Sequence, residues 1–483
     1  MQPTPDVKPV SRSFGSWTLR VILGVAGLLG ACDSREELPV ARNLVFISVD
    51  TLRADRLGCY GYGRDTTPGL DRFARQGMLF QQATAPSPWT LPSHASMFTG
   101  LSPKRHGAKG FKGKLTKQCM TLAEHLQERG FQTHAIVSSS ILTGGGLQRG
   151  FDSLVEVDKG GLKPSAVTTE CIAKLDQIDL GKRFLLLAHY IDPHTDYGSL
   201  EPFHSRFVEP YEGRATGIGQ QLYRAVSGDL EFNAEDVQHL SNLYDGGVAQ
   251  VDEQVAELFA HIKALGIWDQ TLVLVTSDHG EEFLDHGGLM HGFNHHEEMI
   301  RVPLILQGPG IPKGQTSRVP VSLMDLLPTC LLALGLPNPQ ELEGVALQPL
   351  WETPEQERAG RSFFYEADWD APRPGQQSLS SGSDRALRVG RYKLHLNLKT
   401  RAQSLFDLES DPLERVVLVL INPQIAKALE HELLRYLGES ETGLEAALSA
   451  KELEELAGLG YAATDDEQQD VELPGASPAE EGD

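Results

Sequence analysis

Residues 43–50 read NLVFISVD, an apolar run that ends in a carboxylate. The segment Asn43–Val49 carries no charge and is rich in bulky and β-branched side chains. A continuous run of this kind is typical of a central strand that is buried on both faces. The stretch therefore predicts a strand in the middle of a sheet, with other elements packed over both of its sides.

The same pattern recurs further along the chain, with helices between the strands. Buried strands are predicted at Phe131–Val137, Arg183–Ala188 and Gln270–Thr276. Helical spacing of apolar residues is found at Thr67–Gly77, Thr121–Gly130 and Leu240–Leu265. Strands that alternate with helices form a mostly parallel sheet flanked by helices, so the sequence predicts an α/β fold.

Polar residues follow three of these strands. Asp50 follows the first, His189–His194 another, and Ser277-Asp278-His279-Gly280 a third. Ligands bind beyond the carboxyl ends of parallel strands, so these residues are expected to converge. A carboxylate beside an imidazole is a compact pair of ligands for a divalent ion. Taken alone, each of these stretches is equally typical of a turn or a helix cap.

A change in composition divides the chain near residue 375. Residues 376–382 are rich in Ser and Gly. Beyond them, Ala386–Leu394 and Ser404–Leu408 are predicted as short strands, and Pro423–Leu437 as a closing helix. We therefore expect a catalytic domain at residues 42–375 and a small C-terminal α+β subdomain at residues 383–440. Residues 464–483 hold eight acidic and no basic side chains, which predicts a solvated, disordered tail.

The composition limits the choice of partners. The chain has 483 residues, 40% of them hydrophobic, and a formal net charge of −23. This is enough apolar material for a full core. A nucleic acid partner is not expected, because binding a phosphate backbone needs a basic face.

The first 32 residues resemble the signal peptide of a bacterial lipoprotein. A basic start precedes Val21–Ala31, an apolar run of eleven residues, which is too short to span a bilayer but suits a signal-peptide core. The run ends in Leu29-Gly30-Ala31-Cys32, which resembles a lipobox, where cleavage leaves Cys32 as the acylated N-terminus. The alternative is an ordinary signal peptide with a chance cysteine. Residues 33–41 are predicted as a linker.

Export determines the expected location and bears on the other cysteines. An Asp directly after the lipidated Cys, here Asp33, is typical of lipoproteins kept at the inner membrane, so we expect the periplasmic face of that membrane. Cys59, Cys119, Cys171 and Cys330 show no C-x-x-C spacing, which argues against a thiolate metal cluster. In an oxidising compartment they could form disulfides, and the sequence leaves their pairing open.

Several ordered motifs carry a family resemblance. The opening stretch continues to residue 62 as NLVFISVDTLRADRLGCYGY, and PWTLPSH follows at 88–94. Further motifs are YIDPH at 190–194, TSDHGEEFLDHG at 276–287 and SLFDLESDP at 404–412. From about Asn43 to about Leu437 the chain resembles the sulfatase family of the alkaline-phosphatase superfamily. The resemblance implies an alkaline-phosphatase-like sheet and metal-dependent hydrolysis of anionic esters.

The resemblance also implies roles for individual residues. Asp50, Asp278 and His279 match metal-ligand positions of the family. Thr90 matches the nucleophile position, where its oxygen would also touch the metal. This ligand set suits Ca, Mn, Mg or Zn, and the sequence leaves the metal open.

Three histidines occupy further catalytic positions in this resemblance. His194 matches a residue that serves as an acid near the leaving group. His291 lies close to the position of a family lysine, within one residue of alignment. His94 stands where strict sulfatases have the arginine of their C/S-x-P-x-R motif.

Other departures separate the chain from strict sulfatases. Their motif begins with a Cys or Ser that is oxidised to formylglycine, whereas this chain has Thr90, so no formylglycine is expected. Thr51 replaces the second Asp of the usual pair. Ser138–Ile141 replaces a loop that contains a Lys and a His in the family. The chain therefore resembles a divergent branch.

The threonine has a consequence for the substrate. Formylglycine hydrate has two hydroxyl groups, so after one accepts the sulfuryl group the other can expel it. A threonine ester has no second hydroxyl and must be cleaved by water, which is familiar for phosphoryl enzymes. We therefore expect phosphoester or phosphodiester cleavage or transfer on a small-molecule, glycan or lipid substrate. The alternative is sulfuric ester hydrolysis, the activity for which the family is named.

Two further alternatives concern the site. Asp192, His194 and His291 could build a second metal site, which would convert a one-metal centre into a two-metal phosphoesterase centre. His295 and His296 are better explained as exposed residues or as hydrogen-bond partners of site residues. A pseudoenzyme that binds its ligand without turnover is the competing class, since the arginine, the lysine and the formylglycine precursor are missing.

Overall fold

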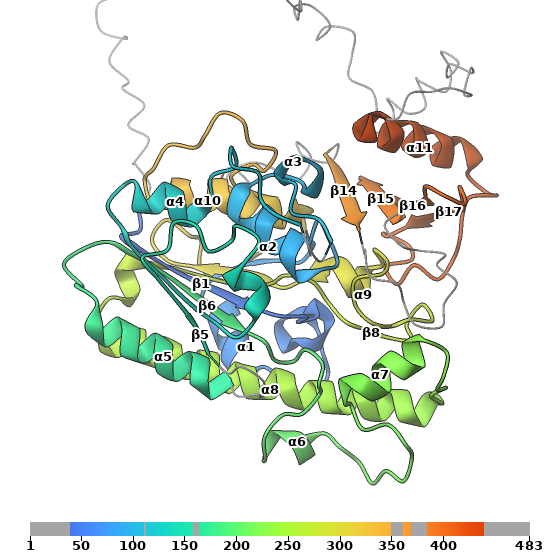
Figure 1. Ribbon diagram of the computed structural model, residues 1–483, viewed down its shortest axis with the longest axis horizontal. Helices are drawn as coiled ribbons and strands as arrows, with labels where there is room; N and C mark the ends of the chain where they lie inside the picture. The colour runs from blue at the N-terminus through green and yellow to red at the C-terminus, as the bar shows by residue number, and fades with distance from the viewer. Residues whose placement is uncertain (1–38, 111–112, 158–163, 349–360, 369–383, 439–483) are drawn as a thin grey trace, which may run out of the picture. The chain divides into compact units, whose positions relative to one another are not determined.

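An eight-stranded sheet forms the centre of the fold, with strand order β12-β2-β11-β7-β1-β6-β4-β5. Its strands β1, β5 and β6 are labelled in Figure 1. The strands are β1 (Asn43–Val49), β2 (Met78–Phe80), β4 (Gln132–Val137), β5 (Ser153–Glu156), β6 (Phe184–Tyr190), β7 (Thr271–Ser277), β11 (Leu304–Gln307) and β12 (Gln315–Ser317). β1 runs parallel to β6 and β7, and β4 runs parallel to β5 and β6. Only β11, among the described strands of this sheet, is antiparallel to its neighbours. The predicted mostly parallel α/β sheet is confirmed.

The computed structural model describes residues 39–110, 113–157, 164–348, 361–368 and 384–438. From Val40 onward these residues belong to one unit. The predicted signal peptide at 1–32, most of the linker at 33–41, the Ser/Gly-rich stretch and the acidic tail lie outside the described residues.

Helices cover both faces of the sheet because the central strand is apolar on both. Successive side chains of a strand point to opposite faces. Leu44 and Phe46 therefore join one buried apolar cluster, and Val45 and Ile47 join the other. The first face is covered by α2 (Thr90–Thr99), α4 (Leu122–Gln127) and α10 (Leu326–Ala333). The second is covered by α1 (Pro68–Ala74), α5 (Pro164–Gln177) and α8 (Ala234–Ala264).

The C-terminal subdomain is a four-stranded antiparallel sheet with one helix on it. It consists of β14 (Ser362–Ala367), β15 (Asp384–Val389), β16 (Tyr392–Asn397), β17 (Gln403–Asp407) and α11 (Pro423–Leu437). Two details differ from the expectation. The stretch Ala386–Leu394 is a hairpin rather than one strand, because the chain turns at Gly390, whose φ is 56°. Strand β14 lies within residues 42–375, yet it pairs with β15 and belongs to the C-terminal sheet.

Short elements connect these layers. They are β3 (Ala83–Thr84), β8 (Glu282–Phe283), β9 (Leu289–Met290), β10 (Arg301–Val302), β13 (Val321–Ser322), α3 (Pro103–His106), α6 (Phe203–Arg206), α7 (Gly219–Val226), α9 (Glu297–Ile300), and the 3₁₀ turns at Ala54–Arg56, Gly58–Tyr60, Ser140–Thr143, Trp268–Gln270 and Leu323–Asp325. Within the described ranges, no helix has the length and apolar character needed to cross a membrane. Cys59, Cys119, Cys171 and Cys330 are all free thiols, so the structure contains none of the disulfides that export would permit among them.

Candidate metal centre and active site

Two carboxylates meet at the carboxyl ends of two neighbouring strands. Val49 of β1 pairs with Ser277 of β7, so Asp50 and Asp278 follow directly after paired residues. Both side chains are buried, and the backbone N–H of Thr51 donates a hydrogen bond to Asp278 Oδ1 at 3.2 Å. The parallel register therefore brings together two carboxylates that lie more than two hundred residues apart in the sequence.

His279 completes a set of three ligands. Its Nε2 lies 3.7 Å from Asp50 Oδ1 and 3.4 Å from Asp278 Oδ2, and one ligand atom of each residue lies within 4.8 Å of the others. The imidazole Nδ1 is 3.0 Å from the Gly280 carbonyl oxygen. Because that carbonyl accepts a hydrogen bond from Nδ1–H, the unprotonated Nε2 faces the two carboxylates.

The residues present fit a divalent cation. Asp50 Oδ1 and Asp278 Oδ2 are buried and accept no hydrogen bond from the described part of the chain. An ionised carboxylate oxygen buried without a partner is costly, and an imidazole lone pair aimed at it adds repulsion. A cation between the three groups removes both penalties. The ligand set predicted from the sequence is thus assembled in one place, and its oxygen and nitrogen donors leave the choice of metal open.

Thr90 is the first residue of helix α2 and lies beside this cluster. Its Oγ1 is 3.3 Å from His279 Nε2, and the side chain is buried. The first backbone N–H groups of a helix lack intrahelical partners and carry partial positive charge, so they favour an anionic group nearby. The geometry places a hydroxyl where the candidate metal ligands and a helix N-terminus meet.

His94 lies one turn further along α2, and it is buried behind the cluster. Its Nε2 is 2.9 Å from Ser48 Oγ, and its Nδ1 is 2.9 Å from the Thr90 carbonyl oxygen and 3.5 Å from Asp278 Oδ2. Burial lowers the pKa of His94 to about 4, although the Asp278 charge opposes the shift. Both ring nitrogens are occupied by protein groups. The contacts therefore favour a supporting role over the direct catalytic role that the sequence predicted.

His189 contacts the cluster; the sequence placed it in a polar stretch after a strand but gave it no role of its own. It lies inside strand β6 rather than in the loop after it, and its Nε2 is 3.4 Å from Asp50 Oδ2. Burial raises the pKa of Asp50. The hydrogen bond with His189 and the charges of His194 and His279 lower it by more than burial raises it, so the pKa of Asp50 is well below its usual value. The available signal was a single polar side chain in an otherwise apolar strand, FLLLAHY.

His194 and His291 lie together on the other side of His279. The ring centroid of His291 lies 4.7 Å from that of His194 and 4.6 Å from that of His279. Burial lowers the pKa of His194, but the charges of Asp50 and Glu281 raise it above its usual value overall. Burial and the neighbouring His279 and His194 lower the pKa of His291. One ring therefore favours its protonated form and the other its neutral form.

Glu281 is a second residue that sequence reasoning missed. Its Oε1 lies 3.1 Å from His291 Nδ1, and its Oε2 is buried with no hydrogen bond from the described residues. Burial raises the pKa of Glu281 to about 7, although the charges of His194 and His279 oppose the shift. The carboxylate orients the His291 ring, so that Nε2 of His291 is the nitrogen left for the site.

The structure supports a second metal site at Asp192, His194 and His291 less well than the site at Asp50, Asp278 and His279. Among the described residues, the groups of ligand atoms within 4.8 Å are Asp50 with Asp278 and His279, and His296 with His395 and Glu414. Asp192 Oδ1 accepts a hydrogen bond from Gln250 Nε2 at 3.3 Å. His295 and His296 are not part of the Asp50 ligand group. His295 is buried rather than exposed, and His296 contacts Glu414 at 3.3 Å rather than a residue of that group.

The loop after Asp50 adopts an unusual backbone conformation. Thr51 has a φ of 55°, which is rare for a β-branched residue and costs on the order of 1–3 kcal/mol. The Tyr244 hydroxyl donates to the Thr51 carbonyl oxygen at 2.7 Å and accepts from the Arg53 backbone N–H at 2.9 Å. This clamp maintains the strained turn that carries Asp50 into the cluster.

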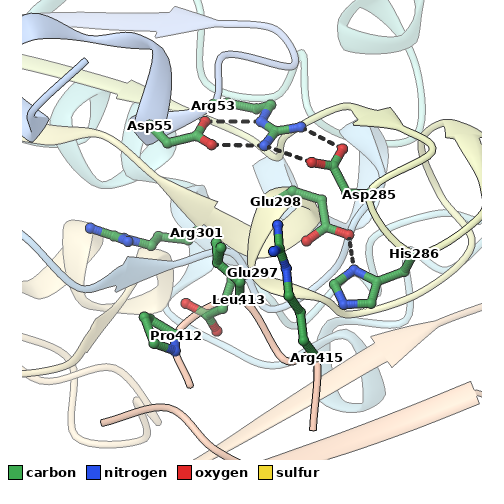
Figure 2. Close-up of a pocket in the computed structure, with 10 residues that line it drawn as sticks. All are labelled: Arg53, Asp55, Asp285, His286, Glu297, Glu298, Arg301, Pro412, Leu413 and Arg415. Carbon is green, nitrogen blue, oxygen red and sulfur yellow. Dashed lines mark hydrogen bonds and ion pairs between the residues drawn. The ribbon is translucent and has the colours of Figure 1, made fainter. Parts of the chain in front are cut away.

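A pocket lies next to this loop (Figure 2). The Arg53 guanidinium contacts Asp55 at 2.7 Å and Asp285 at 2.9 Å in it. The remaining lining residues are His286, Glu297, Glu298, Arg301, Pro412, Leu413 and Arg415. None of the cluster residues lines this pocket, so we assign it to the junction with the C-terminal subdomain and place the chemistry at the cluster.

Comparisons with known proteins identify the family of the chain. The family model described as "Sulfatase" matches residues 42–336, and one described as "N-sulphoglucosamine sulphohydrolase, C-terminal" matches residues 286–441. A Δ4,5-hexuronate-2-O-sulfatase of Bacteroides thetaiotaomicron is 25% identical, with 85% of this chain and 91% of the relative covered. A multifunctional alkaline phosphatase superfamily protein, PehA of Trinickia caryophylli, is 23% identical, with 77% of this chain and 90% of the relative covered.

The solved structures show the same fold. A phosphonate monoester hydrolase of Agrobacterium radiobacter superposes with a TM-score of 0.68 at 21% identity, covering 82% of this chain and 96% of that one. At this level of identity the likeness concerns the fold. Relatives with sulfatase names and a phosphonate ester hydrolase thus share one architecture with this chain.

Proposed function

The chain belongs to the sulfatase family, whose members hydrolyse sulfate and phosphate esters, and we propose that it cleaves phosphoesters with Thr90 as its nucleophile. The observation that carries this proposal is the position of Thr90 Oγ1, 3.3 Å from His279 Nε2 and at the first turn of α2. A hydroxyl in this place can attack an ester whose oxygens lie between the cluster and the helix N-terminus.

Asp50, Asp278 and His279 would bind the metal. When bound, a divalent cation supplies positive charge that lowers the pKa of a nearby hydroxyl and stabilises anionic ester oxygens. The N-terminal N–H groups of α2 add donors for the same oxygens. His94 Nδ1 contacts the Thr90 carbonyl oxygen, and this contact holds the residue that carries the hydroxyl in position.

His194 is placed to act as the acid. Burial lowers the pKa of His194, but the charges of Asp50 and Glu281 raise it overall, which favours the protonated ring. In the first step Thr90 reacts as its alkoxide: its oxygen bonds to phosphorus, the bond from phosphorus to the leaving oxygen breaks, and His194 gives its proton to that oxygen. In the second step the neutral His194 takes a proton from water, the water oxygen bonds to phosphorus, and the bond from phosphorus to Thr90 breaks, which returns the alkoxide and the protonated His194. Threonine offers no second hydroxyl for an internal release, which favours a phosphoester over a sulfate ester.

Purified protein with Mn²⁺ or Zn²⁺ is expected to hydrolyse p-nitrophenyl phosphate or its diester faster than p-nitrophenyl sulfate. The measurement is kcat/KM for the three esters under identical conditions. Sulfuric ester hydrolysis is the second candidate, because several relatives carry sulfatase names. Faster turnover of the sulfate would establish it instead, and no turnover of any ester by metal-loaded protein would favour the pseudoenzyme.

We also propose that the chain is a lipoprotein anchored through Cys32 on the periplasmic side of the inner membrane. The support is the Leu29-Gly30-Ala31-Cys32 sequence after an apolar run of eleven residues. Cys32→Ser is expected to release the protein from the membrane fraction or to block its processing. The measurement is fractionation with mobility on a gel. Wild-type behaviour of the variant in both assays would exclude the anchor.

A further inference from the structure

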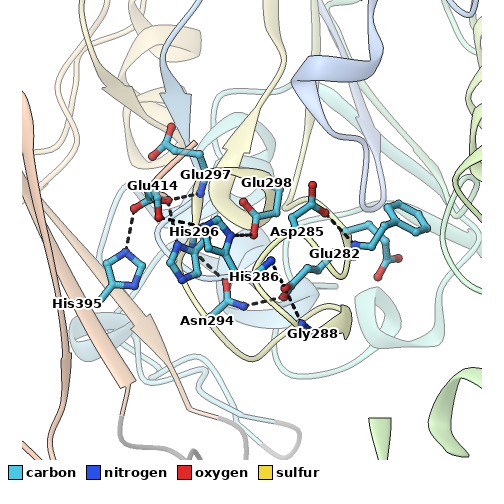
Figure 3. A network of polar contacts seen from close by, with 12 residues as sticks. Glu282, Asp285, His286, Gly288, Asn294, His296, Glu297, Glu298, His395 and Glu414 are labelled. Atoms are coloured by element: carbon cyan, nitrogen blue, oxygen red, sulfur yellow. Dashed lines mark hydrogen bonds and ion pairs between the residues drawn. The ribbon is translucent and has the colours of Figure 1, made fainter. Parts of the chain in front are cut away.

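The loop that carries His291 is fastened at its inner end by the catalytic domain. We call residues 286–298 the His291 loop. Glu282 Oε1 accepts hydrogen bonds from the backbone N–H of His286 at 3.0 Å and of Gly288 at 2.8 Å. Its Oε2 accepts from Asn294 Nδ2 at 2.7 Å (Figure 3). Glu281, the preceding residue, contacts His291 itself. Two adjacent glutamates therefore hold the first part of this loop.

The outer end of the same loop is fastened by the C-terminal subdomain. Glu414 lies between β17 and α11 and is buried. Its Oε2 accepts from the Glu297 backbone N–H at 2.7 Å and contacts His296 Nδ1 at 3.3 Å. Its carbonyl oxygen contacts His286 Nε2 at 3.2 Å, and the His286 and His296 rings stack at 3.6 Å. One residue of the subdomain thus contacts both ends of the His291 loop.

Glu414 is itself fixed by strand β16. Lys393 Nζ is 3.1 Å from Glu414 Oε1, and His395 Nε2 is 3.0 Å from the same oxygen. Lys393 is buried and also contacts Glu297 Oε1 at 2.9 Å. Burial raises the pKa of Glu414, but the Lys393 charge and the contact with His296 lower it overall, so the carboxylate is ionised. The network therefore links the sheet of the subdomain to the His291 loop through one buried anion.

His296, His395 and Glu414 have the side-chain types of a metal site, and their ligand atoms lie within 4.8 Å of one another. However, each oxygen of Glu414 already contacts two hydrogen-bond donors. An ammonium group 3.1 Å from Oε1 also repels a dication. This contrasts with Asp50 Oδ1 and Asp278 Oδ2, which are buried and accept no hydrogen bond from the described residues. The contacts favour a hydrogen-bonded clamp.

We propose that Glu414 is a positioning residue through which the C-terminal subdomain sets the place of His291 in the active site. The inference rests on the proposed function for the role of His291, and on the contacts above for the clamp. Without the carboxylate, the Glu297 N–H and His296 lose their acceptor and Lys393 keeps only Glu297. A buried network that loses its central anion opens locally. The His291 ring is then held only by Glu281 and by the Glu282 contacts of the loop, so its distance to His279 is less restricted.

The test compares Glu414→Gln with Glu366→Gln in the full chain. Glu366 is a matched control, because it is a buried carboxylate on β14 of the same subdomain. It accepts from the Lys104 N–H at 2.9 Å and contacts Lys109 Nζ at 2.5 Å, away from the His291 loop. Hydrogen exchange in peptides spanning 286–298 is expected to rise about tenfold in Glu414→Gln and to stay at the wild-type rate in Glu366→Gln.

Kinetics supply the second readout. With the best phosphoester, kcat of Glu414→Gln is expected to fall roughly tenfold to a hundredfold, with KM and metal content near wild type, because a small misplacement of a catalytic group costs this much. His296→Ala removes one loop contact and leaves the Lys393 pair intact, so it tests the clamp should Glu414→Gln fail to fold. Unchanged exchange in the loop overturns the proposal, and so does metal loss in Glu414→Gln. The exchange assay needs no substrate, so its outcome is separate from that of the proposed function.

Discussion

Thr90→Ala is expected to lower kcat/KM for the best phosphoester by at least about a hundredfold, the scale of losing a nucleophile or a comparable transition-state group. The reason is its position. Thr90 Oγ1 is the hydroxyl that lies 3.3 Å from His279 Nε2, at the first turn of α2. The methyl group of alanine cannot bond to phosphorus. The measurement is steady-state kinetics at fixed metal concentration, with circular dichroism to confirm the fold.

Two variants on the same helix complete this experiment. Thr90→Ser keeps a hydroxyl and is expected to retain more activity than Thr90→Ala. Thr99→Ala removes a buried hydroxyl at the other end of α2, where it donates to the Ala95 carbonyl oxygen at 2.6 Å, and should leave kcat/KM near wild type. Equal activity of wild type and Thr90→Ala would show that Thr90 is not the nucleophile. A water molecule would then be the candidate nucleophile.

The sequence predicted the sheet well because its strands are buried on both faces. A strand such as Asn43–Val49 has no polar face, so its limits are visible as the ends of an apolar run. The cluster could be predicted for the same reason, since Asp50 and Asp278 follow two such runs and parallel strands end at one edge. The boundaries of α8 were less clear, and it begins at Ala234, six residues before the predicted start.

What the sequence did not show depends on contacts between distant segments. His189 became a site residue only through the pairing of β1 with β6, which puts Ser48 opposite it. The role of Glu281 depends on its contact with His291, and the role of Glu414 depends on its contacts with the His291 loop. Strand β14 was not predicted, and it lies within the predicted bounds of the catalytic domain although it pairs with β15, because a strand's sequence does not identify its partner. The role of His94 depends on the direction of its side chain, which the sequence does not show: from within α2 it faces Ser48 and Asp278.

Asp278→Asn is expected to reduce metal affinity by more than the roughly 10–100-fold that loss of a supporting hydrogen-bond partner costs, because Asp278 is itself a ligand. Asparagine has the same shape but no charge, and its amide can turn a nitrogen toward the site. Asp278 Oδ2 is the buried oxygen 3.4 Å from His279 Nε2, and it accepts no hydrogen bond from the described residues. The measurement is metal content after gel filtration in metal-free buffer, together with titration by Mn²⁺ and Zn²⁺.

Asp252→Asn is the matched control for the loss of a buried carboxylate. Asp252 accepts from the backbone N–H groups of Gly69 at 2.8 Å and Leu70 at 2.7 Å, so its role is to hold the start of α1 against α8. This variant is expected to lose stability while keeping the wild-type metal stoichiometry. Asp278→Asn is expected to lose metal without losing stability. Removing one of two buried anions that face each other relieves their repulsion in the metal-free protein. Full metal content in a folded Asp278→Asn protein would exclude Asp278 as a ligand and leave its unpartnered oxygen without an explanation.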